Sequence, residues 1–146
     1  APFARPARNL SPLRDALQEM MWDKAGILRD AAGLTEAASG LDALEAELDN
    51  SGVDGTNRAF NMTWHDWLNL KSLLLVSRAI VVASLAREES RGAHWREDFP
   101  ETRDDSAGLA ATSVRLEAGR VALDWQPVAF SRLKPGESLL TPVAAE

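Results

Sequence analysis

The sequence predicts a mainly α fold: a three-helix up-down-up bundle of the spectrin-repeat type, with a C-terminal β-hairpin and an irregular tail. Apolar residues recur at spacings of three and four in three stretches, at residues 12–29, 34–49 and 64–90. Gly33 separates the first two stretches, and the turn-forming run 50–57 separates the second from the third. Further along the chain, at residues 112–116 and 121–125, apolar and polar residues alternate, which is the pattern of β-strands.

These boundaries divide the chain into an extended N-terminal segment, the bundle, and the hairpin with its tail, at residues 1–11, 12–105 and 106–146. The first segment is rich in Pro and Arg and lacks the apolar run of a secretory signal. Together with the tail 141–146 it favours a complete small chain. A domain cut from a longer protein is the open alternative.

The first helix has a clear expected start. Ser11 supplies a hydroxyl for the N-cap, and Pro12 suits the first helical position because its missing N–H is not needed there. Gly26 lies inside the predicted helix, where it costs about 1 kcal/mol relative to Ala. It indicates either the close approach of a neighbouring element or simple tolerance of glycine.

The third helix is expected to be the central one. Thr63 is a suitable N-cap, with Asp66 at the capping-box position. The helix is apolar over most of its circumference, which predicts burial on several sides, by the first two helices and by a surface outside this chain. Arg78 is the exception and needs a carboxylate or a path to solvent.

The hairpin is expected to turn at residues 117–120. A lone hairpin is marginal in water, so its apolar side chains should lie on the helices or on another sheet. These side chains are Val114, Leu116, Val121, Leu123 and Trp125.

Composition excludes several classes of function. The chain has 146 residues, a net charge of -6 and no cysteine. It therefore has no disulfide, cysteine zinc site or iron–sulfur cluster of its own, and its acidity argues against a nucleic-acid partner. The most apolar run, Leu73 to Ala86, has about 14 residues and contains Arg78, so we expect no direct membrane insertion.

The chemistry of the chain is concentrated after the third helix, in a segment that we call the charged corner, residues 90–105. It combines cations, carboxylates, a histidine and aromatics over a glycine and a closing proline. Its candidate interface or structural residues are Ser90, Arg91, Gly92, His94, Arg96, Glu97, Asp98, Arg103, Asp104 and Asp105.

Three interpretations of the corner are open: a structural network of ion pairs, an acid/base pair of His94 with Glu97 or Asp98, and a metal site. The spacing matches no known pattern of metal ligands, and nothing around Ser90 resembles a nucleophile motif. No glycine-rich phosphate loop is present. We therefore predict no catalytic, cofactor-binding or metal-binding residue, and we favour the structural network.

Two stretches resemble one known family. The run AIVVASLAREESRGAHWREDFPETRDD, from residue 79, resembles the C-terminal region of the succinate dehydrogenase/fumarate reductase flavoproteins, a group that includes L-aspartate oxidase. Upstream, residues 17–22 and 25–29 resemble the family's first C-terminal helix. The hairpin and tail match only loosely. In the first run the matching residues are Arg87, Glu89, Ser90, Arg91, Gly92, Ala93, His94, Asp98, Pro100, Arg103, Asp104 and Asp105.

The resemblance implies a non-catalytic helical domain, or a separately encoded small subunit, that packs against a flavin-binding domain. FAD would be bound by that partner domain or subunit and not by this chain, because the family's flavin-binding segment and catalytic residues lie upstream. An iron–sulfur subunit is a further implied partner. The implied location is cytoplasmic, or peripheral at the inner membrane through partners.

Two rival functions stay open at this point. One is a small enzyme that uses His94 with Glu97 or Asp98 as acid and base. The other is a stand-alone helical adaptor that binds proteins through the acidic side of the second helix. The specificity of the SRGAHWREDFP match argues against the adaptor, because an acidic binding face needs no such motif.

Overall fold

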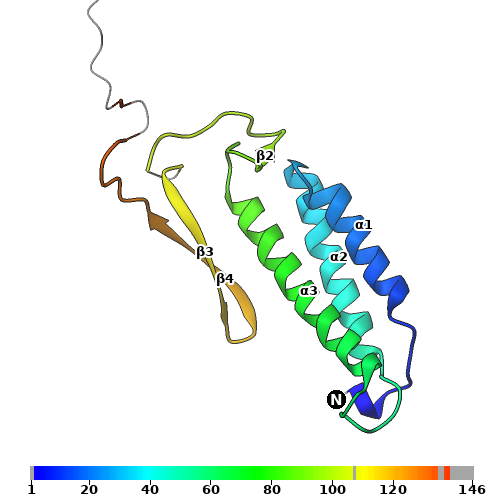
Figure 1. Ribbon diagram of the computed structural model, residues 1–146. Helices are drawn as coiled ribbons and strands as arrows, with labels where there is room; N and C mark the ends of the chain where they lie inside the picture. Colours follow the sequence, from blue (N-terminus) through cyan, green and yellow to red (C-terminus); the bar gives the residue numbers. More distant parts are fainter. Residues whose placement is uncertain (1, 107, 135–136, 139–146) are drawn as a thin grey trace, which may run out of the picture.

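The computed structural model describes residues 2–106, 108–134 and 137–138. In this part of the chain three α-helices lie side by side, α1 (Ser11–Ala25), α2 (Ala31–Asn50) and α3 (Met62–Ala86), after a short 3-10 turn, η1 (Pro2–Ala4) (Figure 1). A hairpin follows, formed by β3 (Ala110–Glu117) and β4 (Arg120–Pro127). The prediction of a mainly α fold with a C-terminal hairpin is confirmed. The finer description, a spectrin-repeat-like up-down-up bundle, stays a prediction.

The core lies where α2 faces α1 and α3. Leu34, Leu41 and Val81 are fully buried. Trp67 is also buried, and its indole Nε1 donates a hydrogen bond to the carbonyl of Leu48 at 3.1 Å, which ties the start of α3 to the end of α2. These apolar contacts hold the helices together, as the spacing of the leucines predicted.

The first helix ends four residues earlier than predicted, at Ala25. Gly26 is therefore the C-cap and not an interior residue, and Ile27 and Leu28 leave the apolar stripe and become exposed. Ser11 is the first helical residue, with no side-chain cap at Leu10 before it. The prediction of a Ser11 cap is wrong.

The cap of α3 also differs from the prediction. Asn61 is the N-cap, and its Oδ1 accepts a hydrogen bond from the backbone N–H of Trp64 at 2.9 Å. Thr63 lies inside the helix and donates its hydroxyl to the same oxygen at 2.8 Å. The Thr63–Asp66 capping box is therefore wrong, because the asparagine begins the helix two residues earlier.

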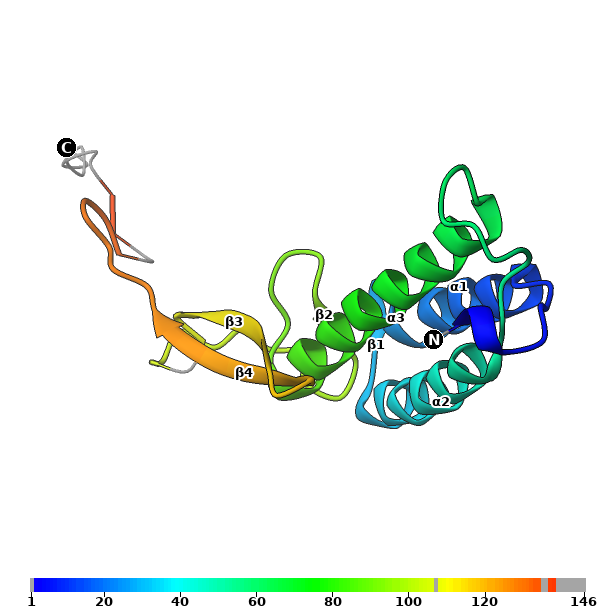
Figure 2. The same cartoon turned by 90° about the horizontal axis from the view of Figure 1, so that it is seen from below.

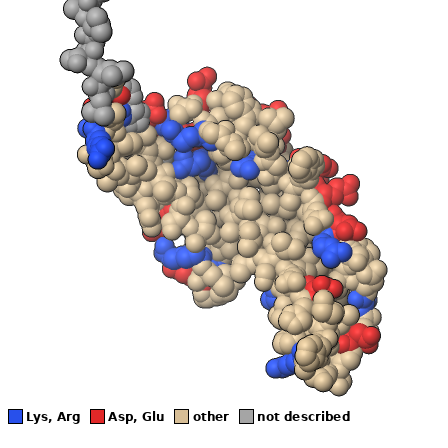
Figure 3. Space-filling view, viewed as in Figure 1, with Lys and Arg blue, Asp and Glu red and all other residues tan. Residues whose placement is uncertain are grey.

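One face of α3 is left open by the described part of this chain, and its expected cover by a surface outside the chain stays a prediction. Leu73, Val76 and Ile80 are 43%, 57% and 41% exposed. In the view of Figure 3, a broad surface without charged groups crosses the middle of the molecule, with charges at its edges. Arg78 has the expected outlet, since it pairs with Asp42 at 2.8 Å and Glu45 at 3.0 Å.

The length and composition of α3 also bear on membranes. By length and composition the whole helix, Met62–Ala86, could cross a bilayer. The run Leu73 to Ala86, on which the sequence prediction was based, is too short to do so. The helix packs against α1 and α2, and 28% of its most apolar window is buried. The absence of direct membrane insertion stays a prediction.

The hairpin contacts α3, on the side away from α1 and α2 (Figure 2). Its turn at Ala118 and Gly119 has positive φ at both residues, as a two-residue hairpin turn of type I′ requires. Val114 and Leu123 are half-buried, whereas Leu116 is 57% exposed and Trp125 37% exposed. The expected burial of the apolar hairpin residues is thus only partial.

Candidate functional site

The charged corner crosses the end of the bundle where α1 and α3 end and α2 begins. A two-residue strand, β2 (Trp95–Arg96), pairs in parallel with β1 (Leu28–Arg29). The corner turns on itself at Gly92, which has a φ of +59°, and Arg91 and His94 exchange two backbone hydrogen bonds across this turn, at 2.8 and 3.1 Å. The chain after α3 is therefore fixed against the chain after α1.

Arg96 organises the corner. Its side chain is 1% exposed and makes a two-point contact with Asp98, with Nε–Oδ1 and Nη2–Oδ2 distances of 2.8 Å each. Its remaining nitrogen, Nη1, donates to the carbonyls of Ser84, Leu85 and Arg87 at 2.7, 3.3 and 3.3 Å. These carbonyls lie at the C-terminus of α3, where intrahelical donors run out, so the guanidinium replaces them and complements the helix dipole.

Asp98 links the same pair to the second helix. Its Oδ2 accepts a hydrogen bond from the backbone N–H of Ala31, the first residue of α2, at 3.0 Å. The hydrogen bonds from Arg96 are the largest cause that lowers the pKa of Asp98, to about 2, and the Ala31 N–H adds to the effect. The carboxylate is therefore ionised at neutral pH, and the pair joins the end of α3 to the start of α2.

Arg29 performs the equivalent role for α1. Its Nε donates to the carbonyls of Ala25 and Gly26, which end that helix. One of its terminal nitrogens reaches the Ser84 hydroxyl at 3.2 Å and His94 Nδ1 at 2.7 Å. All three helix ends are thus held by charged side chains within one polar layer.

The partners of His94 define its protonation. Because Arg29 can only donate, Nδ1 accepts, and Nε2 carries the proton that it donates to the carbonyl of Arg87 at 3.1 Å. Burial is the largest cause that lowers the pKa of His94. The hydrogen bond to the Arg87 carbonyl opposes this, and the charges of Arg29, Arg96 and Arg87 lower the pKa further. His94 is therefore a neutral structural histidine.

A second buried group, Glu89, attaches the corner to the hairpin. The residue is 1% exposed and pairs with Arg87 and with Arg91, and it accepts the backbone N–H of Arg103 at 2.9 Å. Burial alone would raise the pKa of Glu89, but these hydrogen bonds and charges outweigh it and lower the pKa. Arg87 also donates to the carbonyl of Ala110 at the start of β3.

The buried Ser90 holds the charged corner together through hydrogen bonds. It is 3% exposed, its Oγ accepts the backbone N–H of Arg96 at 2.9 Å, and it lies 2.9 Å from the carbonyl oxygen of Phe99. Thr102 donates its hydroxyl to the carbonyl of Ser90 at 2.7 Å. These contacts give Ser90 a positioning role, and the hydrogen-bond partners of its hydroxyl are backbone groups and not a general base.

The outer residues of the corner face solvent. Arg103 pairs with Asp105 at 2.6 Å and Arg91 pairs with Asp104 at 3.4 Å, with all four side chains between 38% and 66% exposed. Glu97 is exposed and makes no side-chain hydrogen bond within the described residues. Gly92 is also exposed at the turn.

The structure separates the predicted residues into two groups. Ser90, His94, Arg96 and Asp98 form the inner network, while the outer group consists of Arg91, Gly92, Glu97, Arg103, Asp104 and Asp105. The proposed acid/base pairing of His94 is not present, because the ring contacts Arg29 and a backbone carbonyl and neither Glu97 nor Asp98. Among the described residues, no group of three or more His, Asp or Glu is placed to hold a metal.

Sequence reasoning missed four members of the network: Arg29, Ser84, Arg87 and Glu89. All four fall within the stretches that resemble the flavoprotein family. Ser84 is not among the residues that match the family pattern, and a serine on an apolar helix gives no signal of a distant contact.

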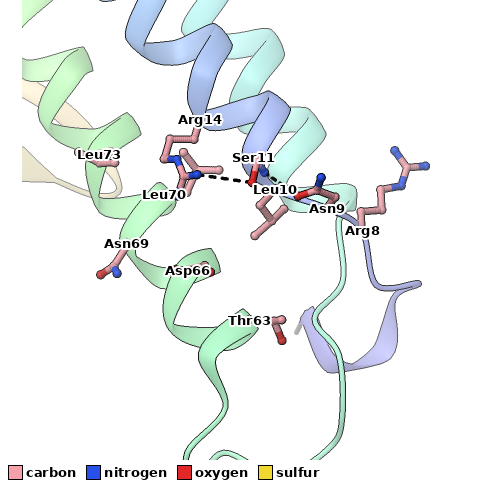
Figure 4. Close-up of a pocket in the computed structure, with 10 residues that line it drawn as sticks. All are labelled: Arg8, Asn9, Leu10, Ser11, Arg14, Thr63, Asp66, Asn69, Leu70 and Leu73. Carbon is pink, nitrogen blue, oxygen red and sulfur yellow. Dashed lines mark hydrogen bonds between the residues drawn. The ribbon is translucent and has the colours of Figure 1, made fainter.

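A separate groove of about 310 Å³ lies at the opposite end of the bundle, between the beginnings of α1 and α3 (Figure 4). Arg14 donates to the Ser11 hydroxyl at 3.4 Å on its α1 side, and Asp66 and Asn69 line its α3 side. The groove shares no residue with the corner, and its charged groups do not converge on one point in Figure 4.

The fold and the corner together define a helical module with one end fixed by buried charges. Residues 14–139 match the family described as the fumarate reductase flavoprotein C-terminus. The chain belongs to this family.

Its relatives are much longer proteins. The chain is 40% identical over 129 residues to the fumarate reductase flavoprotein subunit of Mycobacterium tuberculosis, covering 88% of this chain and 22% of that protein. It is 32% identical over 123 residues to the 8-methylmenaquinol:fumarate reductase flavoprotein subunit of Wolinella succinogenes, covering 84% and 20%. It is also 37% identical over 117 residues to the L-aspartate oxidase of Streptomyces coelicolor, covering 73% and 18%.

Solved structures share the fold. Mycobacterium smegmatis Sdh1 in complex with UQ1 matches with a TM-score of 0.76 at 33% identity, over 89% of this chain and 22% of that chain. The E. coli quinol fumarate reductase FrdA chain matches with a TM-score of 0.82 at 27% identity, over 91% and 23%. This chain therefore spans about a fifth of the length of the proteins that it matches.

Proposed function

We propose that this chain is the non-catalytic C-terminal helical module of an FAD-dependent oxidoreductase of the succinate dehydrogenase/fumarate reductase type. It serves either as a domain of a longer flavoprotein or as a separate subunit. Its role is structural: it packs against the flavin-bearing part of the protein and stabilises the surface that it covers there. In this proposal residues 12–105 are the helical bundle with the charged corner, which carries the docking surface, and residues 106–146 are the hairpin and tail.

FAD belongs to the partner in this proposal. The corner's inner cations do not fit a dinucleotide phosphate, because Arg29, Arg87 and Arg96 already donate to carbonyls or carboxylates of this chain. The sequence also has no glycine-rich phosphate loop. The further elements of the proposal are an iron–sulfur subunit as an additional partner, and a cytoplasmic location, peripheral at the inner membrane through partners.

The observation that supports a docking role is the division within the corner. Buried charges are satisfied inside the chain, which makes the loop rigid, and a row of unburied charges remains on its outside. A rigid surface loses little conformational entropy when it binds, and its exposed charges can select the orientation of a partner. Acid/base chemistry has no such support, because His94 is neutral and its two ring nitrogens are both engaged.

Charge reversal tests the docking role of the corner. Tagged wild-type chain, E97K and a control variant D15K are mixed with extract of the source cells, and captured flavin and its protein are quantified. Glu97 and Asp15 are both exposed acids, but Asp15 lies on α1 away from the corner. E97K should capture several-fold less flavoprotein than D15K. Capture of the same measurable amount of flavoprotein by all three chains would contradict docking through the corner.

A further inference from the structure

A large apolar hollow lies beside the corner, on the α1 side. It has a volume of about 680 Å³, and we call it the Trp22 hollow. Three of its lining side chains are large and apolar, and they are highly exposed: Trp22 at 83%, Ile27 at 69% and Leu28 at 62%. Arg29 and Ala93 complete its inner edge, so the hollow and the corner are continuous.

The hollow is more exposed than the apolar face in the middle of α3. There Leu73, Leu75, Val76 and Ile80 are between 41% and 57% exposed, which is less than any of the three side chains in the hollow. Phe60 and Met62 are also highly exposed, at 100% and 70%, but they lie just before and at the start of α3, at the opposite end of the bundle. A cluster of apolar side chains this exposed is unusual on a soluble protein and marks an interaction surface. Tryptophan is also the side chain most enriched among residues that dominate binding energy.

The walls of the hollow are held in place by the polar layer. Arg29 caps the end of α1 directly behind Trp22, and Leu28 is in register with Trp95 in the two-stranded sheet. The C-cap Gly26 leaves no room for a side chain, because a Cβ there would lie 2.5 Å from the carbonyl oxygen of Trp22. The exposed apolar groups are thus displayed on fixed backbone, which lowers the entropic cost of binding.

The hollow and the depression beside it carry an excess of acidic groups along their shared rim. Their charged lining residues are Asp23, Asp30, Glu36 and Glu97 against Lys24 and Arg29. Lys24 and Glu36 pair at 2.8 Å and cancel each other, and the whole chain carries a net charge of -6. An acidic rim disfavours an anionic bilayer, and it disfavours a second copy of this equally acidic chain.

We propose that the Trp22 hollow is the apolar anchor of the interface with the flavin-bearing part, which inserts apolar side chains between Trp22 and Leu28 and presents basic groups to the rim. This inference rests on the proposed function and names the surface that it uses. About four-fifths of the length of each relative lies outside the region that this chain matches, which provides the protein mass to cover the hollow.

Hydroxyl-radical footprinting of the intact flavoprotein that carries this chain tests the proposal, whether that protein is one polypeptide or a complex. Oxidation of individual tryptophans is read by mass spectrometry. Trp67, which is 7% exposed in the core, gives the buried reference, and the protein unfolded in urea gives the fully reactive one. Trp22 should be shielded by roughly fivefold or more relative to the unfolded protein, since interface cores pack as tightly as protein interiors.

Trp95, in the corner and 43% exposed, separates the two hypotheses. If Trp95 is shielded while Trp22 stays reactive, the proposal for the Trp22 hollow fails and docking through the corner still stands. If both tryptophans stay reactive, both proposals fail. Shielding of Trp22 that needs added anionic vesicles, or that occurs in a flavin-free assembly of two copies, would overturn the proposal in favour of a membrane or of self-association.

Discussion

Replacing Arg96 with methionine should destabilise the module more than any comparable change on its surface. The guanidinium is 1% exposed, and its removal leaves the carboxylate of Asp98 without its partner and the Ser84 carbonyl without its donor. Removing one partner of a buried ion pair costs about 3–5 kcal/mol, because the other charge is left desolvated. We take the lower part of this range, about 3 kcal/mol, since Asp98 retains 30% exposure and the Ala31 N–H.

Arg115 on the hairpin provides a matched control. It also contacts two carboxylate groups, Glu117 at 2.6 Å and Asp124 at 3.3 Å, but its side chain is 52% exposed. The variant R115M should therefore lose less than about 1 kcal/mol. Urea unfolding followed by tryptophan fluorescence gives both values, and an unchanged slope with denaturant shows that the native state is still compact.

A double variant separates the pair from the rest of the network. If Arg96 and Asp98 act together, R96M/D98N should cost clearly less than the sum of the two single variants, because the second change removes a charge that the first has stranded. A loss below about 1 kcal/mol for R96M, equal to that of R115M, would refute the assignment of Arg96 as the residue that holds the helix ends.

Three further predictions concern titration and capping. The lowered pKa of His94 means that the unfolded chain takes up the proton first, so stability should fall as the pH drops below about 6.5; a H94Q variant should show a flatter profile from pH 7 to 5, and an unchanged profile would contradict a neutral His94. Asp98, with a pKa of about 2, contributes stability that is present above its unfolded value of 3.8 and is lost as the pH falls through 2. The contribution is about 1–2 kcal/mol after allowance for solvent screening, so the difference between wild type and D98N should shrink over that interval in acid titrations. At the start of α3, N61A should cost about 1–2 kcal/mol of unfolding free energy, whereas D66A should cost less than about 0.5, and the reverse order would restore the capping box.

Sequence patterning was sufficient for the elements that obey local rules. The buried leucines of α2 and one apolar stripe of α3, which includes Trp67, Leu74 and Val81, face the core at helical spacing. The turn at Ala118 and Gly119 follows from the alternation on either side. Arg78 was recognisable because a lone cation among apolar residues requires a partner.

The ends of the helices could not be derived in this way. Apolar periodicity continues through Ile27 and Leu28, yet α1 stops at Ala25 because Arg29 takes the last carbonyls and is itself held by His94, 65 residues away. Likewise the helix pattern runs on to Ser90, but α3 ends at Ala86. Glu89 accepts the backbone N–H of Arg103, and Arg87 donates to the carbonyl of Ala110. Both boundaries depend on contacts between distant segments.

One part of the network was accessible from local reasoning. Arg96 and Asp98 are two residues apart within a charged run, so a tight turn between them can bring their side chains together. In the structure this turn is present, and the backbone N–H of Phe99 donates to the carbonyl of Arg96 at 3.1 Å. Arg96 points into the molecule and Glu97 points to solvent. This difference is set by the parallel pairing of the segment with Leu28 and Arg29, which the sequence alone does not predict.

The measurement that tests the account most directly is isolation of the native protein that contains this sequence, from its own cells, followed by an absorbance scan. If the proposed function is correct, the preparation is yellow, with the absorbance bands of the flavin cofactor near about 370 and 450 nm. This sequence is then present in the same polypeptide or the same complex as the flavin. A colourless preparation that contains only a 15.9 kDa chain would contradict the proposed function.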